Sequence, residues 1–203
     1  MNLNRYVLRL WTVGLITIVM AMTAFGGTAS AAVPGLQLVS AQSASNSSSK
    51  SVTVSCPSGK VVIGAGGQVN VGTSGRAVLD EITPLPNLSG VTAVGVETVG
   101  GTTSNWTVKA YAICASAGAV PGLQLVSAQS AINSSVKSVT ASCPSGKQLI
   151  GAGGQINATS GEAVLDEITP LPNLSGVTTV GVEPGSGTAN SWSVKSYAIC
   201  ATP

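Results

Sequence analysis

The chain has 203 residues, of which 8% are charged and 3% aromatic, and it contains no histidine. Its formal net charge of +2 comes from Arg5 and Arg9, because the remainder has seven basic and seven acidic residues. These basic residues are scattered singly, whereas phosphate backbones and anionic membranes bind clustered Lys and Arg. Charge therefore argues against a nucleic-acid partner, and solubility must rest on Ser, Thr, Asn and Gln.

Residues 1–32 have the layout of a secretory signal peptide. A basic head is followed by the apolar stretch Leu10–Ala24 and by small residues up to Ala32. The alternative is an uncleaved membrane anchor, but the apolar stretch is shorter than the roughly 20 residues that span a bilayer. We predict cleavage after Ala31 or Ala32, a secreted extracellular protein, and no stable membrane insertion after cleavage.

The remainder of the chain is an internal duplication. Val33–Ala115 recurs as Val120–Ala201, with most aligned residues identical and only Gly72 lacking a counterpart. Repetition of this kind indicates repeated structural units. We predict repeat 1 at residues 33–115, a short linker at 116–119 and repeat 2 at 120–203.

Each copy contains two cysteines, which we expect to pair with each other. Four cysteines allow three pairings, and the repeat favours Cys56–Cys114 and Cys143–Cys200 because each copy should be a complete folding unit. Zinc binding is the alternative, but zinc sites use closely spaced Cys and His ligands. A disulfide closing so long a loop contributes roughly 4 kcal/mol in the chain-entropy model.

The pattern within one copy predicts β-strands and no long helix. Runs rich in Val, Ile, Leu and Thr alternate with Ser, Asn, Gly and Pro clusters. The expected strands of repeat 1 are Leu36–Gln42, Ser51–Cys56, Lys60–Asn70, Ala77–Pro84, Val91–Glu97 and Asn105–Ala115. The predicted fold class is all-β, with two tandem antiparallel sandwich, jelly-roll or β-prism-like repeats, each closed by one disulfide.

Alternation along the last strand predicts which residues are interior. Trp106 and Cys114 lie on one face, and Tyr111 and Ile113 on the other. The face with the tryptophan and the disulfide should be the core, and Trp192 to Cys200 repeats this layout.

Two segments carry a resemblance to a known group of proteins. CPSGKVVIGAGGQ (Cys56–Gln68) and NWTVKAYAICA (Asn105–Ala115) recur at Cys143–Gln155 and Ser191–Ala201. They resemble a signature of small secreted proteins from actinobacteria and other soil bacteria, with a CPxGK turn, a Gly-rich strand and a closing WxxxAYAxC strand. This resemblance implies a disulfide-closed, secreted β-module and supplies no catalytic residues.

The residues that usually support catalysis are nearly missing. The GAGGQ stretch at Gly64–Gln68 lacks the spacing of a phosphate-binding loop, and glycines within a strand more often allow a bulge or a close backbone contact. Asp80 or Glu81 could pair with Glu97 if their strands are neighbours, as a carboxyl pair or a calcium site, although solvated acids or salt bridges are the simpler interpretation. We predict no enzyme activity, no cofactor and no metal site.

Two surface features are candidates for binding. Lys109 and Tyr111, repeated as Lys195 and Tyr197, could stack on a sugar or hold a protein, or could pack against a second layer. The loop ITPLPNLSG is stiffened by its prolines. It could present Leu85 and Leu171 to a partner or tuck them into the core.

Three functions remain open at this point. The first is a non-catalytic tandem binding module that holds an extracellular glycan or cell-envelope polymer by avidity. The second is a structural or coat-type protein that associates with itself. The third is a secreted inhibitor that uses the Pro-flanked loop.

Overall fold

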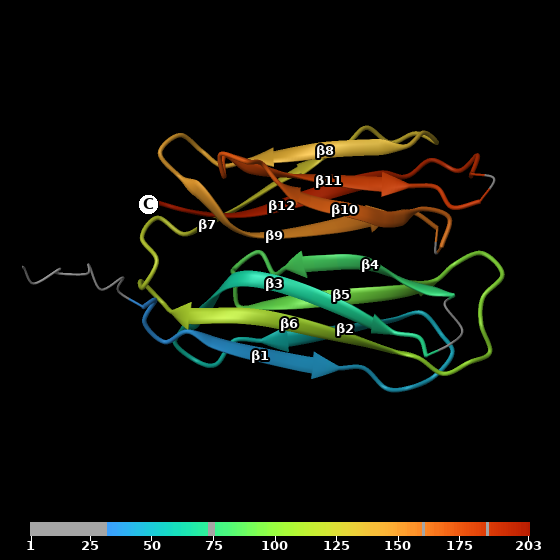
Figure 1. Ribbon diagram of the computed structural model, residues 1–203, viewed down its shortest axis with the longest axis horizontal. Coiled ribbons are helices and arrows are strands. Elements are labelled where there is room, and N and C mark those ends of the chain that lie inside the picture. Colours follow the sequence, from blue (N-terminus) through green and yellow to red (C-terminus); the bar gives the residue numbers. More distant parts are fainter. Residues whose placement is uncertain (1–31, 73–75, 160, 186) are drawn as a thin grey trace, which may run out of the picture. The chain divides into compact units, whose positions relative to one another are not determined.

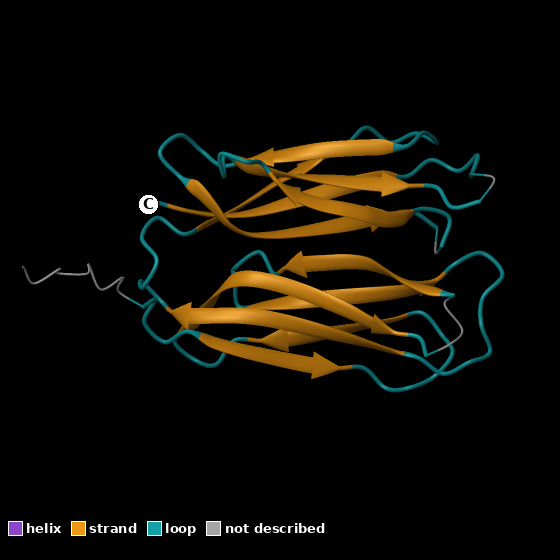
Figure 2. Cartoon of the chain, in the orientation of Figure 1, coloured by secondary structure: helices purple, strands orange, loops and turns teal. Residues whose placement is uncertain are grey.

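A computed structural model describes residues 32–203, except 73–75, 160 and 186. The predicted signal peptide lies outside the described residues apart from Ala32. All regular structure in the described part is β-strand, as predicted (Figure 2). Repeat 1 contains β1 (Gln37–Gln42), β2 (Lys50–Ser55), β3 (Lys60–Asn70), β4 (Ala77–Pro84), β5 (Gly90–Glu97) and β6 (Thr107–Ser116). Repeat 2 contains β7 (Gln124–Gln129), β8 (Lys137–Ser142), β9 (Gln148–Asn157), β10 (Val164–Pro170), β11 (Gly176–Val182) and β12 (Ser193–Ala201).

The strands form three antiparallel sheets, shown in Figure 1. One sheet has the order β1-β6-β3, and another has the order β10-β11-β8. The third has six strands in the order β2-β5-β4-β9-β12-β7 and therefore contains strands of both repeats. The join is the pairing of β4 with β9. Within each copy, corresponding strands pair in the same way.

The core lies where alternation along the last strand of each copy predicts it. Trp106 is 1% exposed, and Val108, Ala110, Ala112 and Cys114 on the same face of β6 are fully buried. They pack in one cluster with residues of β2, β3 and β5. Trp192 and Cys200 are buried in the same way in repeat 2. This burial is the main source of stability, at about 25 cal/mol for each Å² of apolar surface removed from water.

Glycines make room for the two large indole rings. A Cβ placed on Gly95 would lie 2.7 Å from a ring carbon of Trp106, and one on Gly181 would lie 2.7 Å from Trp192. No side chain fits at that distance, so the small residue of β5 or β11 allows the tryptophan to lie flat in the core.

The core of repeat 2 contains a pair of polar residues where the core of repeat 1 has two alanines. Ala93 and Ala110 of repeat 1 are replaced by Thr179 and Ser196 in repeat 2. Both polar side chains are fully buried, and the Thr179 hydroxyl donates to Ser196 Oγ at 2.9 Å. A buried hydroxyl without a partner would be costly, so the two replacements satisfy each other.

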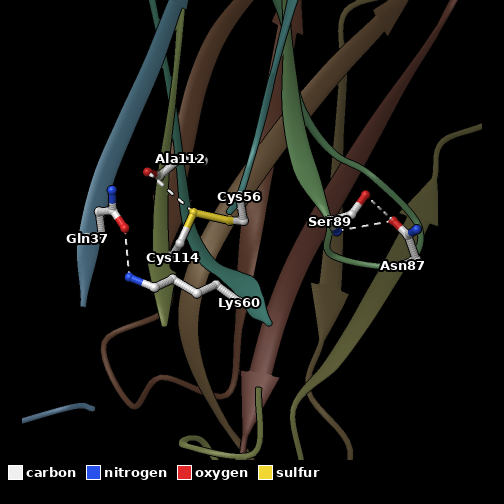
Figure 3. The surroundings of a disulfide bond; sticks show 7 residues. All are labelled: Gln37, Cys56, Lys60, Asn87, Ser89, Ala112 and Cys114. Carbon is white, nitrogen blue, oxygen red and sulfur yellow. Dashed lines mark hydrogen bonds between the residues drawn. A yellow bond between two sulfur atoms is a disulfide. The ribbon is translucent and has the colours of Figure 1, made fainter. Parts of the chain in front are cut away.

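Each copy is closed by its own disulfide, as predicted. Cys56 bonds to Cys114, and Cys143 bonds to Cys200. Figure 3 shows that the Cys56–Cys114 bond lies beside the hydrogen bond from Lys60 Nζ to Gln37 Oε1, which measures 2.6 Å. The disulfide and this hydrogen bond together tie the start of β3 to β1 and β6.

In repeat 1 the ITPLPNLSG loop buries Leu88 rather than Leu85. Leu85 is only half-buried, whereas Leu88 is 6% exposed and adopts φ +55°. The hydroxyl of Ser89 donates to Asn87 Oδ1 at 2.7 Å (Figure 3), and Leu88 N donates to Leu85 O at 2.8 Å. These bonds hold a tight turn. Leu174 adopts the same backbone conformation in repeat 2, with φ +56°, but is 42% exposed, so the turn alone does not bury this leucine.

Candidate functional site

In repeat 1 two of the predicted binding residues, Lys109 and Tyr111, lie together on β6, whereas Leu85 lies in the loop after β4. Lys109 Nζ lies 5.0 Å from the centre of the Tyr111 ring, which is within range of a cation–π contact. The Tyr111 hydroxyl donates to Gln68 Oε1 on β3 at 2.8 Å. Tyr111 is half-exposed, and its neighbour Ile113 is 43% exposed. This sheet face is open to a partner.

In repeat 2 the equivalent residues have the same internal geometry but are covered. Lys195 Nζ again lies 5.0 Å from the Tyr197 ring, and the Tyr197 hydroxyl donates to Gln155 Oε1 at 2.7 Å. Tyr197, however, is 7% exposed, and Ile199 is fully buried. Tyr197 and Lys195 line a hollow of about 330 Å³ with Pro84 of repeat 1. The two tyrosines are therefore not equivalent surfaces.

The covering comes from the contact between the two copies. Glu81 lies opposite Gln155, and Ile82 lies opposite Gly154, in the β4–β9 pairing. Gln155 Nε2 donates to Glu81 Oε1 at 3.0 Å. A Cβ on Gly153 would lie 2.3 Å from the carbonyl oxygen of Ile82, so this glycine permits the close approach of the two backbones. The interpretation of the GAGGQ stretch as a strand with a close backbone contact is thus confirmed.

One side of the contact belongs to repeat 1 and is here called the β4 patch: Asp80, Ile82, Pro84 and Leu88. Its counterpart in repeat 2, the β10 patch, consists of Asp166, Ile168, Pro170 and Leu174. Pro84 is buried but Pro170 is exposed, and Leu88 is 6% exposed whereas Leu174 is 42% exposed. The same residue types are therefore covered in repeat 1 and open in repeat 2.

The other side belongs to repeat 2 and is here called the β12 face: Leu123, Leu125, Gly153, Tyr197 and Ile199. Its counterpart in repeat 1, the β6 face, consists of Leu36, Leu38, Gly66, Tyr111 and Ile113. Leu123, Leu125 and Ile199 pack with the core cluster of repeat 1. Leu36 and Leu38 are instead 58% and 64% exposed. This face is covered in repeat 2 and open in repeat 1.

The acidic residues support structure in both copies. Glu97 Oε1 accepts from Trp106 Nε1 at 3.1 Å, and Glu183 Oε1 accepts from Trp192 Nε1 at 2.6 Å. The backbone N–H of Thr188 and the indole of Trp192 lower the pKa of Glu183. Among the described residues, no group of three or more His, Cys, Asp or Glu side chains is placed to hold a metal ion.

Lysines that sequence reasoning did not single out complete these tryptophan sites. Lys50 Nζ lies 3.1 Å from the centre of the Trp106 ring, and Lys137 Nζ lies 3.8 Å from the Trp192 ring. Burial lowers the pKa of both lysines. Each lysine stands at the start of a strand at the same place in both copies, and only this recurrence could have suggested its role.

Asp80 is the one buried acid in the described part of the chain. It occupies the β-bulge between Leu79 and Glu81 and is 9% exposed. Burial raises the pKa of Asp80 to about 7, and the adjacent Glu81 carboxylate adds to the rise. Asp166 occupies the same bulge in β10 but is exposed. The difference again follows from the covering of the β4 patch.

A polar hollow of about 670 Å³ lies at the end of β5. It is lined by Arg76, Glu97 and the loop 100–103. In repeat 2, Glu162 replaces Arg76, and its carboxylate accepts from Asn190 Nδ2 at 2.8 and 2.9 Å. The two copies therefore present different charges at this position.

No helix of sufficient length and apolarity to cross a membrane is found among the described residues. The two disulfides are typical of an oxidising, extracellular-type compartment. A scan against protein-family models finds no match, and a comparison with curated proteins finds no match either.

Proposed function

We propose that this chain is a secreted, non-catalytic structural protein that works by associating with itself, as a coat-type extracellular component. Each copy is best understood as a six-stranded sandwich. The strand order β1-β6-β3 and β2-β5-β4 is that of a shortened jelly roll. In this fold the chain pairs with itself as one long hairpin, and the hairpin then curls into two packed sheets.

This proposal rests on a difference in burial between the copies. Identical residues at matching positions are covered in one copy and exposed in the other. Repeat 1 uses its β4 patch and repeat 2 uses its β12 face to hold the copies together. The β10 patch and the β6 face are nearly the same surfaces, and both are open. Open apolar surfaces such as Leu38 and Leu174 favour association with a partner.

Glycan or envelope-polymer binding is the second candidate, and it rests on Tyr111. A partly exposed tyrosine beside Lys109 and Gln68 offers a stacking surface with polar groups. Tyr197 does not offer the same surface, because it is 7% exposed. Avidity from two equal sites is therefore less well supported than self-association.

Sedimentation at increasing protein concentration, with and without cell-wall or chitin-like polymer, separates the two functions. Self-association predicts larger species as the concentration rises from about 1 to 100 μM, a range chosen to bracket a modest dissociation constant. Glycan binding predicts a monomer that co-sediments with the polymer and loses retention in Tyr111→Ala. A protein that remains monomeric and does not bind the polymer at any concentration would contradict both functions.

A further inference from the structure

Some strands are sheet edges in both copies, and others are edges in only one copy. Among the described residues, β1 and β7 are edges, and so are β2 and β8. The strand β4 is paired on both sides, but its counterpart β10 pairs only with β11. The strand β9 is paired on both sides, but its counterpart β3 pairs only with β6. Among the described residues the second edges of β10 and β3 therefore have no pairing strand, although the backbone of β3 at Ile63 and Gly64 lies against Gly151 of β9.

The sequences of the two open surfaces match those of the occupied ones. The segment Ala163–Thr178 is identical to Ala77–Thr92, which includes the whole β4 patch. Likewise Val33–Ala44, which supplies Leu36 and Leu38, is identical to Val120–Ala131. A surface made of the same residues on the same backbone can form the same contact.

The polar residues at the open edges already have the conformation used in the occupied contact. Gln68 accepts the Tyr111 hydroxyl at 2.8 Å, as Gln155 accepts that of Tyr197 at 2.7 Å. Thr169 donates to Glu167 at 3.3 Å, as Thr83 donates to Glu81 at 3.4 Å. Such preorganisation lowers the entropic cost of association.

The contact is heterologous, because it joins two different surfaces of the repeat. A heterologous contact leaves one copy of each surface unused and therefore repeats until it closes into a ring or extends as a filament. Unpaired edge strands that carry apolar side chains are also the usual sites at which sheets join between molecules.

We propose that a second copy of this chain docks head to tail, with β10 of one molecule pairing antiparallel with β3 of the next. In this pairing Glu167 lies opposite Gln68, and Ile168 lies opposite Gly67, as Glu81 and Ile82 lie opposite Gln155 and Gly154. Leu174 of the first molecule then packs on the β6 face of the second. This inference rests on the proposed function and specifies its interface.

The decisive variants are Gly66→Arg and Leu174→Arg, one on each side of the contact. A Cβ on Gly66 lies 3.6 Å from Tyr111 Cβ, an ordinary distance within one chain, whereas its counterpart Gly153 has no room beneath Ile82. Gly66→Arg should therefore leave the fold intact and block docking. Val136→Arg is the matched control, because Val136 is 62% exposed and lies outside both surfaces.

Each variant is compared with the parent by sedimentation velocity, and near-UV circular dichroism checks its fold. We expect both decisive variants to raise the dissociation constant at least tenfold and the control to leave it unchanged. A second pair tests the register. Gln68→Glu places a second carboxylate opposite Glu167 of the neighbouring molecule and should weaken association. The double variant Gln68→Glu with Glu167→Gln again pairs one carboxylate with one amide and should restore association.

The outcomes distinguish this inference from the proposed function. If the parent protein associates but neither Gly66→Arg nor Leu174→Arg weakens it, the β10–β3 contact is wrong while self-association stands. If the parent remains monomeric at every concentration, both fail. Weakening by both variants with rescue by the double exchange supports the interface in the stated register.

Discussion

Asp80→Asn is expected to stabilise the protein at pH 8 and to have little effect at pH 4. Burial raises the pKa of Asp80 from its ordinary value of 3.8 to about 7. The folded state therefore binds a proton that the unfolded state has lost between these two pH values, so stability falls as the pH rises from about 4 to 7. Above pH 7 the cost of the buried carboxylate is constant, at about 4 kcal/mol from the size of the shift.

Asparagine removes that cost because it is neutral and of similar shape. The gain should appear between pH 4 and 7, and urea unfolding at closely spaced pH values measures it. The matched control is Asp166→Asn, in the same bulge of an exposed strand, where a change below about 0.5 kcal/mol is expected. Equal effects of the two substitutions would mean that Asp80 is not covered by the contact between the copies.

Trp106→Ala is expected to lower the free energy of unfolding by about 3–5 kcal/mol. The ring is 1% exposed and fills the space left by Gly95. Its removal also leaves Glu97 without the indole donor and Lys50 without the ring beneath it. Trp192→Ala should cost a similar amount, because Glu183, Lys137 and Gly181 surround Trp192 in the same way.

Trp106→Phe separates packing from hydrogen bonding. Phenylalanine retains most of the apolar contact and the cation–π partner but loses the N–H that Glu97 accepts, so a smaller cost of about 1–3 kcal/mol is expected. Urea unfolding followed by far-UV circular dichroism measures both variants. A loss below about 1 kcal/mol in Trp106→Ala would show that the indole is not central to the core.

Local patterns predict the strands, the buried face of β6 and the cysteine pairing. These properties depend on alternation along one strand and on the completeness of one copy, and both are visible in the residues themselves. The conformation of Leu88 was not predictable, because a leucine with positive φ is uncommon and nothing in the pattern marks it. The lysine contacts of Trp106 and Trp192 were missed because they join strands that are distant in sequence.

The difference between the copies could not be predicted from the residues at all. Pro84 and Pro170 lie in identical segments, yet only Pro84 is buried. Tyr111 and Tyr197 make the same internal contacts, yet only Tyr197 is covered. The cause is the neighbour that each surface meets, and one sequence repeated twice does not specify which surface meets which.

Hydrogen exchange at the strand edges tests the central claim, that the contact between the copies recurs between molecules. At about 1 μM, well below a modest dissociation constant, we predict that the outer amides of β10 and β3 exchange much faster than those of β4 and β9. At about 100 μM the amides of β10 and β3 should become protected, while β2 and β8 remain unchanged. Exchange in β10 and β3 that does not depend on concentration, or protection that appears at β2 or β8 instead, would contradict the claim.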